Sequence, residues 1–529
     1  MQNLASFLNN KKEIFYIIII LLFSISINQY YGNLGVCPID SFWFFNSGYD
    51  SLNGYYPFKD YWTISGPFIT LIQALLFKML GVSWFSYVLH ASIFNFLISI
   101  STFYTLYKFK LNTNYCFLYS LLIAILAYPS AGTPFVDHHA TILSIIALLF
   151  FILALKTKSK IYWFFLPVIL VISFLSKQTP TAYIFLLIIF LSGIYFLINF
   201  DIKKILFGLL GTLSIILCFL LIIFITQIPF ESFYEQYIAF PMTIGENRVD
   251  YFLFPLEFSR IFLRFKLIHL PLLLMIFLSI KKIKNDFNYI KSEDFLITIS
   301  LIFSSYMLIA HQLMTINGMY IFFIIPILSG FAHIYFFREY QNKNYILYFI
   351  LIFSICSTIH YGNKYINKRD FMDLTKANFS QTIEANIFDN KLKGLKWISC
   401  LKSDNPKEEV ENLKEAINLI KNDKRKKGII TEYQFISVIL STYDYSPSEV
   451  WFMNHVVNLK NDSKFFLSYK KLLINKIKKH DIKIFYIIKP FWNDDELFEK
   501  GIDKNCYKKT KLTDILDSYL LQDCEDFKS

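Results

Sequence analysis

The sequence is poor in charge: Asp, Glu, Lys and Arg make up only 17% of its 529 residues, whereas 55% are hydrophobic and 19% aromatic. A chain of this composition is neither intrinsically disordered nor a water-soluble enzyme. Seven cysteines are too few for a small disulfide-stapled scaffold. The sequence also lacks a glycine-rich phosphate-binding loop, the ligand spacing of a zinc site and an internal repeat. These absences leave a membrane protein as the class to consider.

Apolar runs of roughly 20 residues, enough to cross a hydrocarbon core about 30 Å thick, recur between Ile14 and Ile359 and then stop. We therefore predict a polytopic α-helical membrane protein with about eleven transmembrane helices. The predicted spans are residues 14–28, 84–106, 114–130, 139–155, 161–176, 180–199, 205–227, 266–280, 294–311, 319–336 and 344–360.

Clusters of Lys and Arg between the spans predict the orientation, because basic residues accumulate on the cytoplasmic side. This rule places the N-terminus in the cytoplasm and the C-terminal region outside, in the periplasm of a bacterial inner membrane. The apolar stretch from Phe68 to Leu80 is short and contains Lys78, so we expect it to lie on the outer surface or to be re-entrant. No small-residue cleavage site follows the first apolar run, so we expect no cleaved signal peptide. The net charge of +12 comes from both parts of the chain and needs no nucleic-acid partner.

The spans predict a transmembrane domain over residues 1–360, with a long first outer loop at 29–84, and a soluble α/β domain over residues 361–529. In the latter, Asn405, Pro406 and Glu408 are typical of a helix start, and the helix is expected to reach about Lys421. A strand beginning at Gly428, a helix over 465–479 and a strand over 482–488 then predict a small parallel sheet. Cys506 and Cys524 form the candidate disulfide of an oxidising compartment.

The first outer loop carries three acidic residues at intervals of ten, Asp40, Asp50 and Asp60. A carboxylate held at the membrane interface beside aromatic side chains has a pKa suited to accepting a proton, or binds a metal. Taken singly, the spacing of each Asp is more typical of a solvated loop acid or of a helix N-cap than of a catalytic or metal-binding group.

A second acidic feature is Asp137 with His138 and His139, which ends an uncharged loop and opens a span. Asp and His can share a metal, or His can hold a carboxylate in place for phosphate or hydroxyl chemistry. The alternative is a helix start in which Asp137 interacts with the helix dipole. Lys177 lies at the outer end of a span, where a lone cation needs an anionic partner such as a lipid phosphate.

Further polar residues fall on the same predicted face. Arg248 and Arg260 lie in the middle outer loop and add positive charge, although snorkelling to lipid headgroups explains each of them. His311 and Gln312 begin a tight outer turn, either as polar loop residues or as part of the same cleft.

The run Gly54, Pro57-Phe58, Asp60-Tyr61 and Gly66-Pro67, the early loop acid Asp40 and the sequence Phe-Leu-Ser-Lys at 174–177 resemble the GT-C superfamily. These are integral-membrane glycosyltransferases similar to bacterial protein mannosyltransferases and aminoarabinose transferases. The resemblance covers roughly residues 1–360. It implies an inverting hexosyl- or pentosyltransferase that moves a sugar from a polyprenyl-phosphate donor to a cell-envelope glycan, lipid or protein at the outer leaflet.

Carried over by residue, the resemblance implies Asp40 as the first-loop acid, Asp137 as the second-loop acid and Lys177 as the lysine that meets the lipid phosphate. Ser41 follows Asp40 where many relatives have a second acid, which leaves the general base open between Asp40 and Asp60. Positive charge around the departing phosphate would come from Lys177 with Arg248 or Arg260. A metal requirement, for Mg or Mn at Asp40 and Asp137, is left open.

Two other classes remain alternatives at this point. A transporter or lipid-linked-sugar flippase predicts paired half-repeats and ionisable residues near span midpoints. An O-antigen polymerase or ligase also works on lipid-linked sugars at the outer face.

Overall fold

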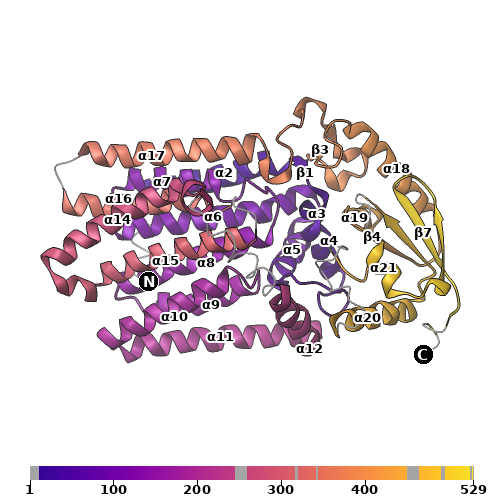
Figure 1. The fold of residues 1–529 in the computed structure, drawn as a ribbon, viewed down its shortest axis with the longest axis horizontal. Helices are drawn as coiled ribbons and strands as arrows, with labels where there is room; N and C mark the ends of the chain where they lie inside the picture. Colours follow the sequence, from indigo (N-terminus) through magenta and orange to yellow (C-terminus); the bar gives the residue numbers. More distant parts are fainter. Residues whose placement is uncertain are drawn as a thin grey trace. The chain divides into compact units, whose positions relative to one another are not determined.

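The structure is a computed structural model, and it describes residues 11–244, 259–315, 320–340, 344–449, 464–489, 495–524 and 527. The chain divides into two compact units, each built from separated stretches of sequence (Figure 1). The first unit comprises Met1–Gly32, Ala91–Leu220 and Arg248–Phe371. The second comprises Asn33–His90, Leu221–Asn247 and Met372–Ser529.

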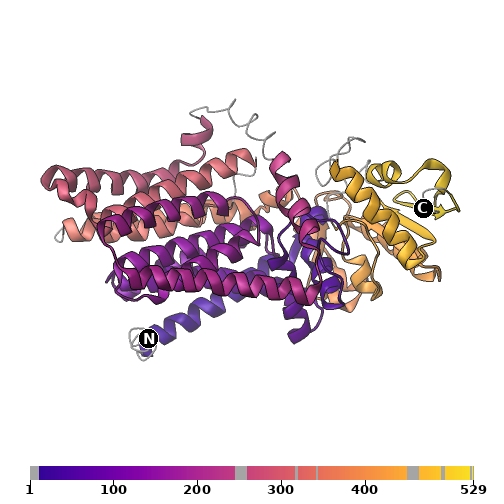
Figure 2. The same cartoon turned by 90° about the horizontal axis from the view of Figure 1, so that it is seen from below.

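The first unit consists of long helices that run alongside one another in both views (Figures 1 and 2). Each predicted span overlaps one of these helices within the described residues, although several spans were predicted to extend beyond the helix ends. Helix α6 begins and α11 ends in the second unit. Short helices η2 (Ser259–Leu263), η3 (Phe287–Lys291) and η4 (Asn363–Asn367) accompany them. The long helices are α2 (Lys11–Gly32), α6 (Trp84–Lys108), α7 (Thr113–Leu126), α8 (Val136–Lys156), α9 (Ile161–Phe174), α10 (Thr181–Ile198), α11 (Ile202–Thr226), α14 (Lys266–Asn285), α15 (Glu293–Met314), α16 (Ile324–Glu339) and α17 (Asn344–Gly362).

Within the described residues, seven helical segments are long and apolar enough to cross a membrane. The chain therefore has the makeup of a polytopic helical membrane protein, as predicted, whereas eleven crossings stay a prediction. The seven segments are Lys11–Gly32, Trp84–Lys108, Val136–Lys156, Thr181–Ile198, Ile202–Thr226, Glu293–Met314 and Tyr345–Met372.

Helix α8 is the centre of the first unit. It is apolar around its whole circumference and almost entirely buried, which is typical of a helix surrounded by other helices. Lys156 at its end contacts Asp294 of α15 at 3.1 Å, and Arg338 of α16 reaches the same carboxylate at 3.3 Å. Asp137 stands in its first turn. Charged groups therefore lie at both ends of this helix of 21 residues, which is about 30 Å long.

Helix α11 approaches α9 through two glycines. A Cβ placed on Gly211 would lie 2.0 Å from the carbonyl oxygen of Phe164, and one on Gly208 would lie 3.7 Å from that of Trp163. Small residues that let two backbones approach closely are typical of helix contacts in membranes.

Gly211→Ala is expected to destabilise the protein, because α11 must move away from the Phe164 carbonyl, at a cost of about 1–3 kcal/mol. Gly193→Ala in α10 is the matched control, since a Cβ there meets open space and alanine favours the helix. The measurement is the apparent unfolding temperature in detergent. Equal effects of the two substitutions would contradict the close approach.

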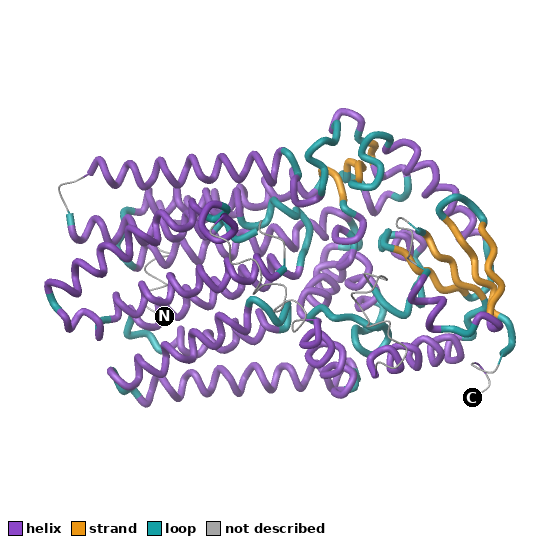
Figure 3. The backbone as a smooth tube through the Cα atoms, viewed as in Figure 1, coloured by secondary structure: helices purple, strands orange, loops and turns teal. Residues whose placement is uncertain are grey.

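The second unit joins the predicted first outer loop to the C-terminal region and holds the described strands (Figure 3). Its first-loop elements are β1 (Leu34–Val36), α3 (Pro38–Ser41), α4 (Trp43–Leu52) and α5 (Pro67–Leu80), and its middle stretch forms α12 (Phe230–Phe233) and η1 (Tyr234–Ala239). Helix η5 (Asp370–Met372) spans the boundary between the two units. The C-terminal elements are η6 (Phe379–Gln381), β2 (Ile383–Glu384), η7 (Ala385–Ile387), η8 (Asn390–Leu392), β3 (Lys396–Ser399), α18 (Pro406–Asn422), β4 (Lys427–Thr431), α19 (Ile436–Leu440), α20 (Lys464–His480), β5 (Ile484–Ile488), α21 (Glu496–Gly501), η9 (Lys504–Cys506), β6 (Tyr507–Lys511) and β7 (Leu516–Leu521).

A three-stranded sheet of order β1-β3-β2 connects the first loop to the chain after the last span. β1 pairs with β3 in parallel, with Leu34 opposite Lys396 and Val36 opposite Ser399. The predicted division at residue 360 therefore differs from the compact units, since the loop placed with the spans packs with residues 372–529. The physical reason is backbone pairing, which a three-residue strand does not reveal in its sequence pattern.

The predicted C-terminal elements are present. Asn405 caps α18 by accepting from the Glu408 N–H, and Pro406 occupies the first turn. β4 and β5 pair in parallel as predicted, but β5 also pairs antiparallel with β7, and β6 follows, so the four-stranded sheet is mixed. The predicted disulfide between Cys506 and Cys524 is confirmed.

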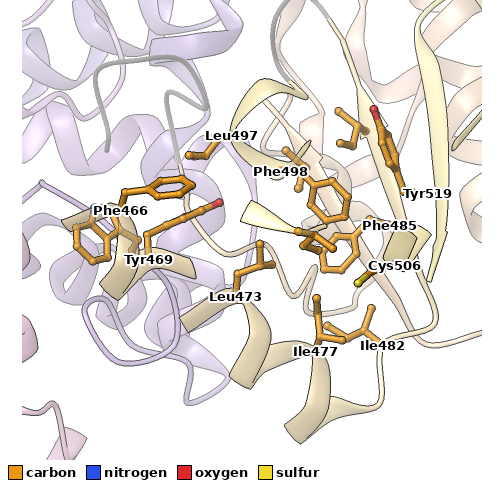
Figure 4. Packing of buried hydrophobic residues seen from close by; sticks show 14 of the residues in the cluster. Phe466, Tyr469, Leu473, Ile477, Ile482, Phe485, Leu497, Phe498, Cys506 and Tyr519 are labelled. Carbon is orange, nitrogen blue, oxygen red and sulfur yellow. The ribbon is translucent and has the colours of Figure 1, made fainter. Parts of the chain in front are cut away.

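One face of α20 packs on this sheet (Figure 4). Phe466, Tyr469, Leu473 and Ile477 recur at helical spacing and lie in one buried cluster with Phe485 and Tyr519. This core joins α20 to the four-stranded sheet.

Candidate functional site

The predicted site residues fall in both units. Asp40 and Asp60 belong to the second unit, whereas Asp137, His138, His139, Lys177, Arg260, His311 and Gln312 belong to the first. Arg248 lies outside the described residues.

In the first unit, three predicted residues meet. The Lys177 Nζ donates to Asp137 Oδ1 at 2.6 Å, and His311 Nε2 lies 3.1 Å from the same oxygen. Asp137 and His311 are buried, whereas the Lys177 side chain is 21% exposed. An ammonium group has three N–H donors, so the pairing with Asp137 leaves Lys177 able to bind an oxyanion as well.

Hydroxyl contacts hold the turn that carries Lys177 against α8. The Ser173 Oγ donates to the carbonyl of Ala140 at 2.9 Å and lies 2.8 Å from the Thr181 hydroxyl, while the Ser144 hydroxyl lies 3.0 Å from that of Ser173. On the other side, Arg369 donates to the carbonyl groups of the loop before Asp137. Hydrogen bonds therefore hold both the turn that carries Lys177 and the loop that precedes Asp137.

The two histidines after Asp137 have other partners. His138 Nε2 lies 2.6 Å from the Ser130 hydroxyl, and His139 Nδ1 forms a short hydrogen bond with the Tyr128 hydroxyl. Arg260 is exposed on η2, and Gln312 is buried beside His311 on α15. The structure thus brings Asp137, Lys177 and His311 together but directs His138 and His139 to the preceding loop.

Lys177→Met is expected to lower the stability by about 3–5 kcal/mol, because it leaves the buried Asp137 carboxylate without its ammonium partner. Asp137→Asn leaves behind Lys177, the more exposed of the two charges, and should cost less. The double variant should recover part of the loss, and a double-mutant cycle on unfolding in detergent measures it. Strictly additive effects would show that the two side chains are not coupled.

In the second unit, Asp40 is half-buried in α3, which begins after Cys37. The Asp60 carboxylate accepts a hydrogen bond from the Tyr56 N–H at 2.8 Å, and the backbone N–H of Asp60 donates to the Tyr56 carbonyl at 2.9 Å. Asp60 therefore closes a tight turn.

A buried carboxylate cluster is the main feature of the second unit that we did not predict. The Asn46 amide nitrogen lies 3.2 Å from Asp50 Oδ2, 3.3 Å from Glu449 Oε2 and 3.4 Å from Asp444 Oδ2. An amide nitrogen has two N–H groups, so it cannot satisfy three carboxylates at once. Among the described residues, Asp50 Oδ1 has no hydrogen-bond donor.

Burial dominates the electrostatics of this cluster. Burial and the charges of Glu449 and Asp444 raise the pKa of Asp50 well above its usual range. Burial also raises the pKa of Asp444 to about 6, and burial with the Asp444 charge raises the pKa of Glu449 to about 8. Burial lowers the pKa of the nearby Lys476 to about 8. Burial therefore moves the pKa values of Asp444, Glu449 and Lys476 closer to neutral pH than the usual values of these groups.

A cavity of about 490 Å³ lies over Asp50. Two of the three stretches of the second unit contribute to it, since Tyr55 of the first loop stacks on Tyr443 of the C-terminal region with ring centroids 3.7 Å apart. The Arg425 guanidinium, on another side, is held by Asp423, with an N–O distance of 2.8 Å. The remaining lining residues are Tyr49, Asn53, Lys426, Lys427, Ser441, Thr442 and Tyr445.

The sequence contains little that points to this site. Asp50 was noted only for its spacing, and Asp444 and Glu449 lie in a Tyr-, Ser- and Pro-rich loop without a motif. The available signal is that Asn46 and Asp50 lie one helical turn apart on the α4 face that carries buried residues.

No family model matches the chain, and no curated protein matches it. The site is therefore interpreted from its own geometry. Within the described ranges, no group of three or more His, Cys, Asp or Glu side chains is arranged to hold a metal ion. The assignment of Asp40 and Asp137 as metal ligands stays a prediction.

The free energy of unfolding is expected to fall as the pH rises from about 4, the usual carboxylic acid range, to about 8. Within this window the folded protein holds protons on Asp444 and Glu449 that the unfolded chain releases. Lys476 acts in the opposite direction, but only above about pH 8.

Glu449→Gln should reduce the change in apparent unfolding temperature between about pH 4 and pH 8 by a few degrees. A change of about 1 kcal/mol in the free energy of unfolding shifts the unfolding temperature of a unit of 150–250 residues by roughly 2–4 °C. Glu411→Gln, at an exposed surface pair, is the control. Parallel curves for the wild type and Glu449→Gln would contradict the raised pKa.

Proposed function

We propose that the chain is an inverting glycosyltransferase of the GT-C type, which transfers a sugar from a polyprenyl-phosphate donor to a hydroxyl group of a cell-envelope acceptor. The observation that carries the proposal is the cavity over Asp50, which combines tyrosine rings with a buried carboxylate whose pKa is raised. Sugars offer C–H faces to aromatic rings and hydroxyl groups to polar side chains, and the cavity provides both kinds of contact.

The proposed reaction needs one proton acceptor. Asp50 accepts the proton of the acceptor hydroxyl, and the hydroxyl oxygen bonds to the anomeric carbon of the donor sugar. The bond between that carbon and the phosphate oxygen breaks. The polyprenyl phosphate leaves with the electron pair, so no acid is needed to protonate it. A carboxylate whose pKa is raised holds the transferred proton more strongly than an ordinary Asp side chain does. Asp444 and Glu449 support it by raising the proton affinity of Asp50.

The predicted roles of the other residues form the rest of the proposal. Lys177, with Arg248 or Arg260, is assigned to the donor phosphate. Asp40 is the second candidate for the base. Asp60 is a weaker one, because its carboxylate closes a turn.

We also propose a bacterial inner-membrane protein with eleven crossings, a cytoplasmic N-terminus and a periplasmic second unit. The disulfide between Cys506 and Cys524 supports an oxidising compartment for this unit. The exposed apolar side chains of α5, Leu75, Met79 and Leu80, support contact with the lipid surface.

The distribution of ion pairs favours a transferase over a transporter. Asp137 pairs at the start of α8, Lys156 pairs at its end, and Lys281 of α14 pairs with Glu339 at the end of α16. Transporters instead place ionisable groups near the middle of broken helices. The described ion pairs of the first unit lie at helix ends.

The test is transfer of labelled sugar from a panel of polyprenyl-phosphate sugars by the purified full-length protein. Asp50→Asn is expected to lower kcat by a factor of about 10²–10⁴, because it removes the proton acceptor and keeps the shape of the side chain. Glu409→Gln is the matched control, a buried carboxylate of the same unit that does not line the cavity.

Each outcome has a defined meaning. Transfer that is lost in Asp50→Asn and kept in Glu409→Gln supports both the reaction and the base. Transfer that is kept in Asp50→Asn but lost in Asp40→Asn would identify Asp40 of α3 as the base. Absence of transfer with every donor, together with lipid or solute movement in liposomes, overturns the proposal.

A further inference from the structure

Two cysteines that are far apart in the sequence meet at the end of the β1-β3 pair. Cys37 directly follows β1 and Cys400 directly follows β3, and these strands run in parallel with Val36 opposite Ser399. The two Sγ atoms lie 3.0 Å apart, although 363 positions separate the residues. Both cysteines belong to the second unit.

We propose that Cys37 and Cys400 are joined by a disulfide, a covalent link between the first outer loop and the C-terminal region. A disulfide requires its sulfur atoms to lie about 2.05 Å apart, so the thiols must move together by about 1 Å. Neighbouring strands hold the two backbones at a separation suited to this bond. The second unit already contains a disulfide between Cys506 and Cys524.

The exposure of the two thiols suggests the order of the reaction. Cys400 is partly exposed, whereas Cys37 is buried. The Cys400 thiolate attacks an external disulfide, such as that of a thiol oxidase or of oxidised glutathione. A mixed disulfide forms, and the first external thiol leaves. Cys37 then attacks the Cys400 sulfur and expels the second thiol. The chain loses two protons and two electrons, and the external disulfide becomes two thiols.

The link bears on the cavity because of where it lies. Cys37 precedes α3 and α4, which carry Asp40, Asn46 and Asp50, whereas Asp444 and Glu449 follow Cys400. A bond between Cys37 and Cys400 therefore holds together the two stretches that share the carboxylate cluster. It also closes a long chain loop, which reduces the conformational freedom of the unfolded state.

The proposal is tested on the full-length protein by complete reduction, reoxidation with oxidised glutathione, alkylation under denaturing conditions and peptide mass spectrometry. The expected result is one crosslinked peptide pair with Cys37 and Cys400, a second with Cys506 and Cys524, and alkylation of Cys116, Cys218 and Cys356 only. Defined reoxidation makes the result independent of the compartment in which the protein was expressed.

Alkylation or glutathionylation of Cys37 or Cys400, with Cys506 and Cys524 again crosslinked, would overturn the proposal. Cys400→Ser is the matched variant: it should leave Cys37 reactive and lower the apparent unfolding temperature only relative to the oxidised wild type. If reduced wild type and Cys400→Ser unfold at the same temperature while oxidised wild type unfolds higher, the stabilisation comes from the bond. The readout does not depend on transferase activity.

Discussion

The parallel pairing of β1 with β3 is the constraint on which the second unit depends. Three residues of the first outer loop pair with four residues that follow the last predicted span, and this contact brings residues 33–90 and 372–529 into one body. α4 then packs with Asn46 and Asp50 facing Asp444 and Glu449. Without the strand pair, neither stretch alone would contain the carboxylate cluster or the tyrosine-lined cavity.

The first unit follows a different constraint, the cost of charge in an apolar environment. Its apolar helices carry ion pairs near their ends, and four of these pairs, Lys156–Asp294, Asp137–Lys177, Lys281–Glu339 and Arg338–Asp294, join helices or turns that are distant in the sequence. Asp137 is the clearest case, since Lys177 and His311 converge on one of its oxygens. An isolated buried carboxylate would be costly, so this arrangement holds α8, α15 and the turn that carries Lys177 together around a polar centre.

The sequence allowed prediction of features that depend on local pattern. Apolar runs located the helices, Asn405 and Pro406 marked a helix start, and residue type alone paired Cys506 with Cys524. It also selected Asp137, Lys177 and His311, because polar residues at helix ends in a membrane protein need partners. It did not show the β1-β3 pairing, since three residues have no measurable periodicity. Asp444 and Glu449 were missed because their role depends on contact with α4, about 400 positions away in the sequence.

Comparison of two buried carboxylates in the second unit supports a chemical role for Asp50. Glu409 is also buried, but it accepts from the Trp397 indole at 2.9 Å, the Tyr433 hydroxyl at 2.8 Å and the Ser399 hydroxyl at 2.8 Å. Such a group is fully satisfied and belongs to the architecture. Asp50 shares one amide nitrogen with two other acids, and one of its oxygens has no donor within the part of the chain that the structure describes. Folding alone gains nothing from an unsatisfied acid, since an apolar side chain would fill the same space at lower cost. An acid in this environment, among the residues that line the cavity, is consistent with the proton-accepting role that we propose for Asp50.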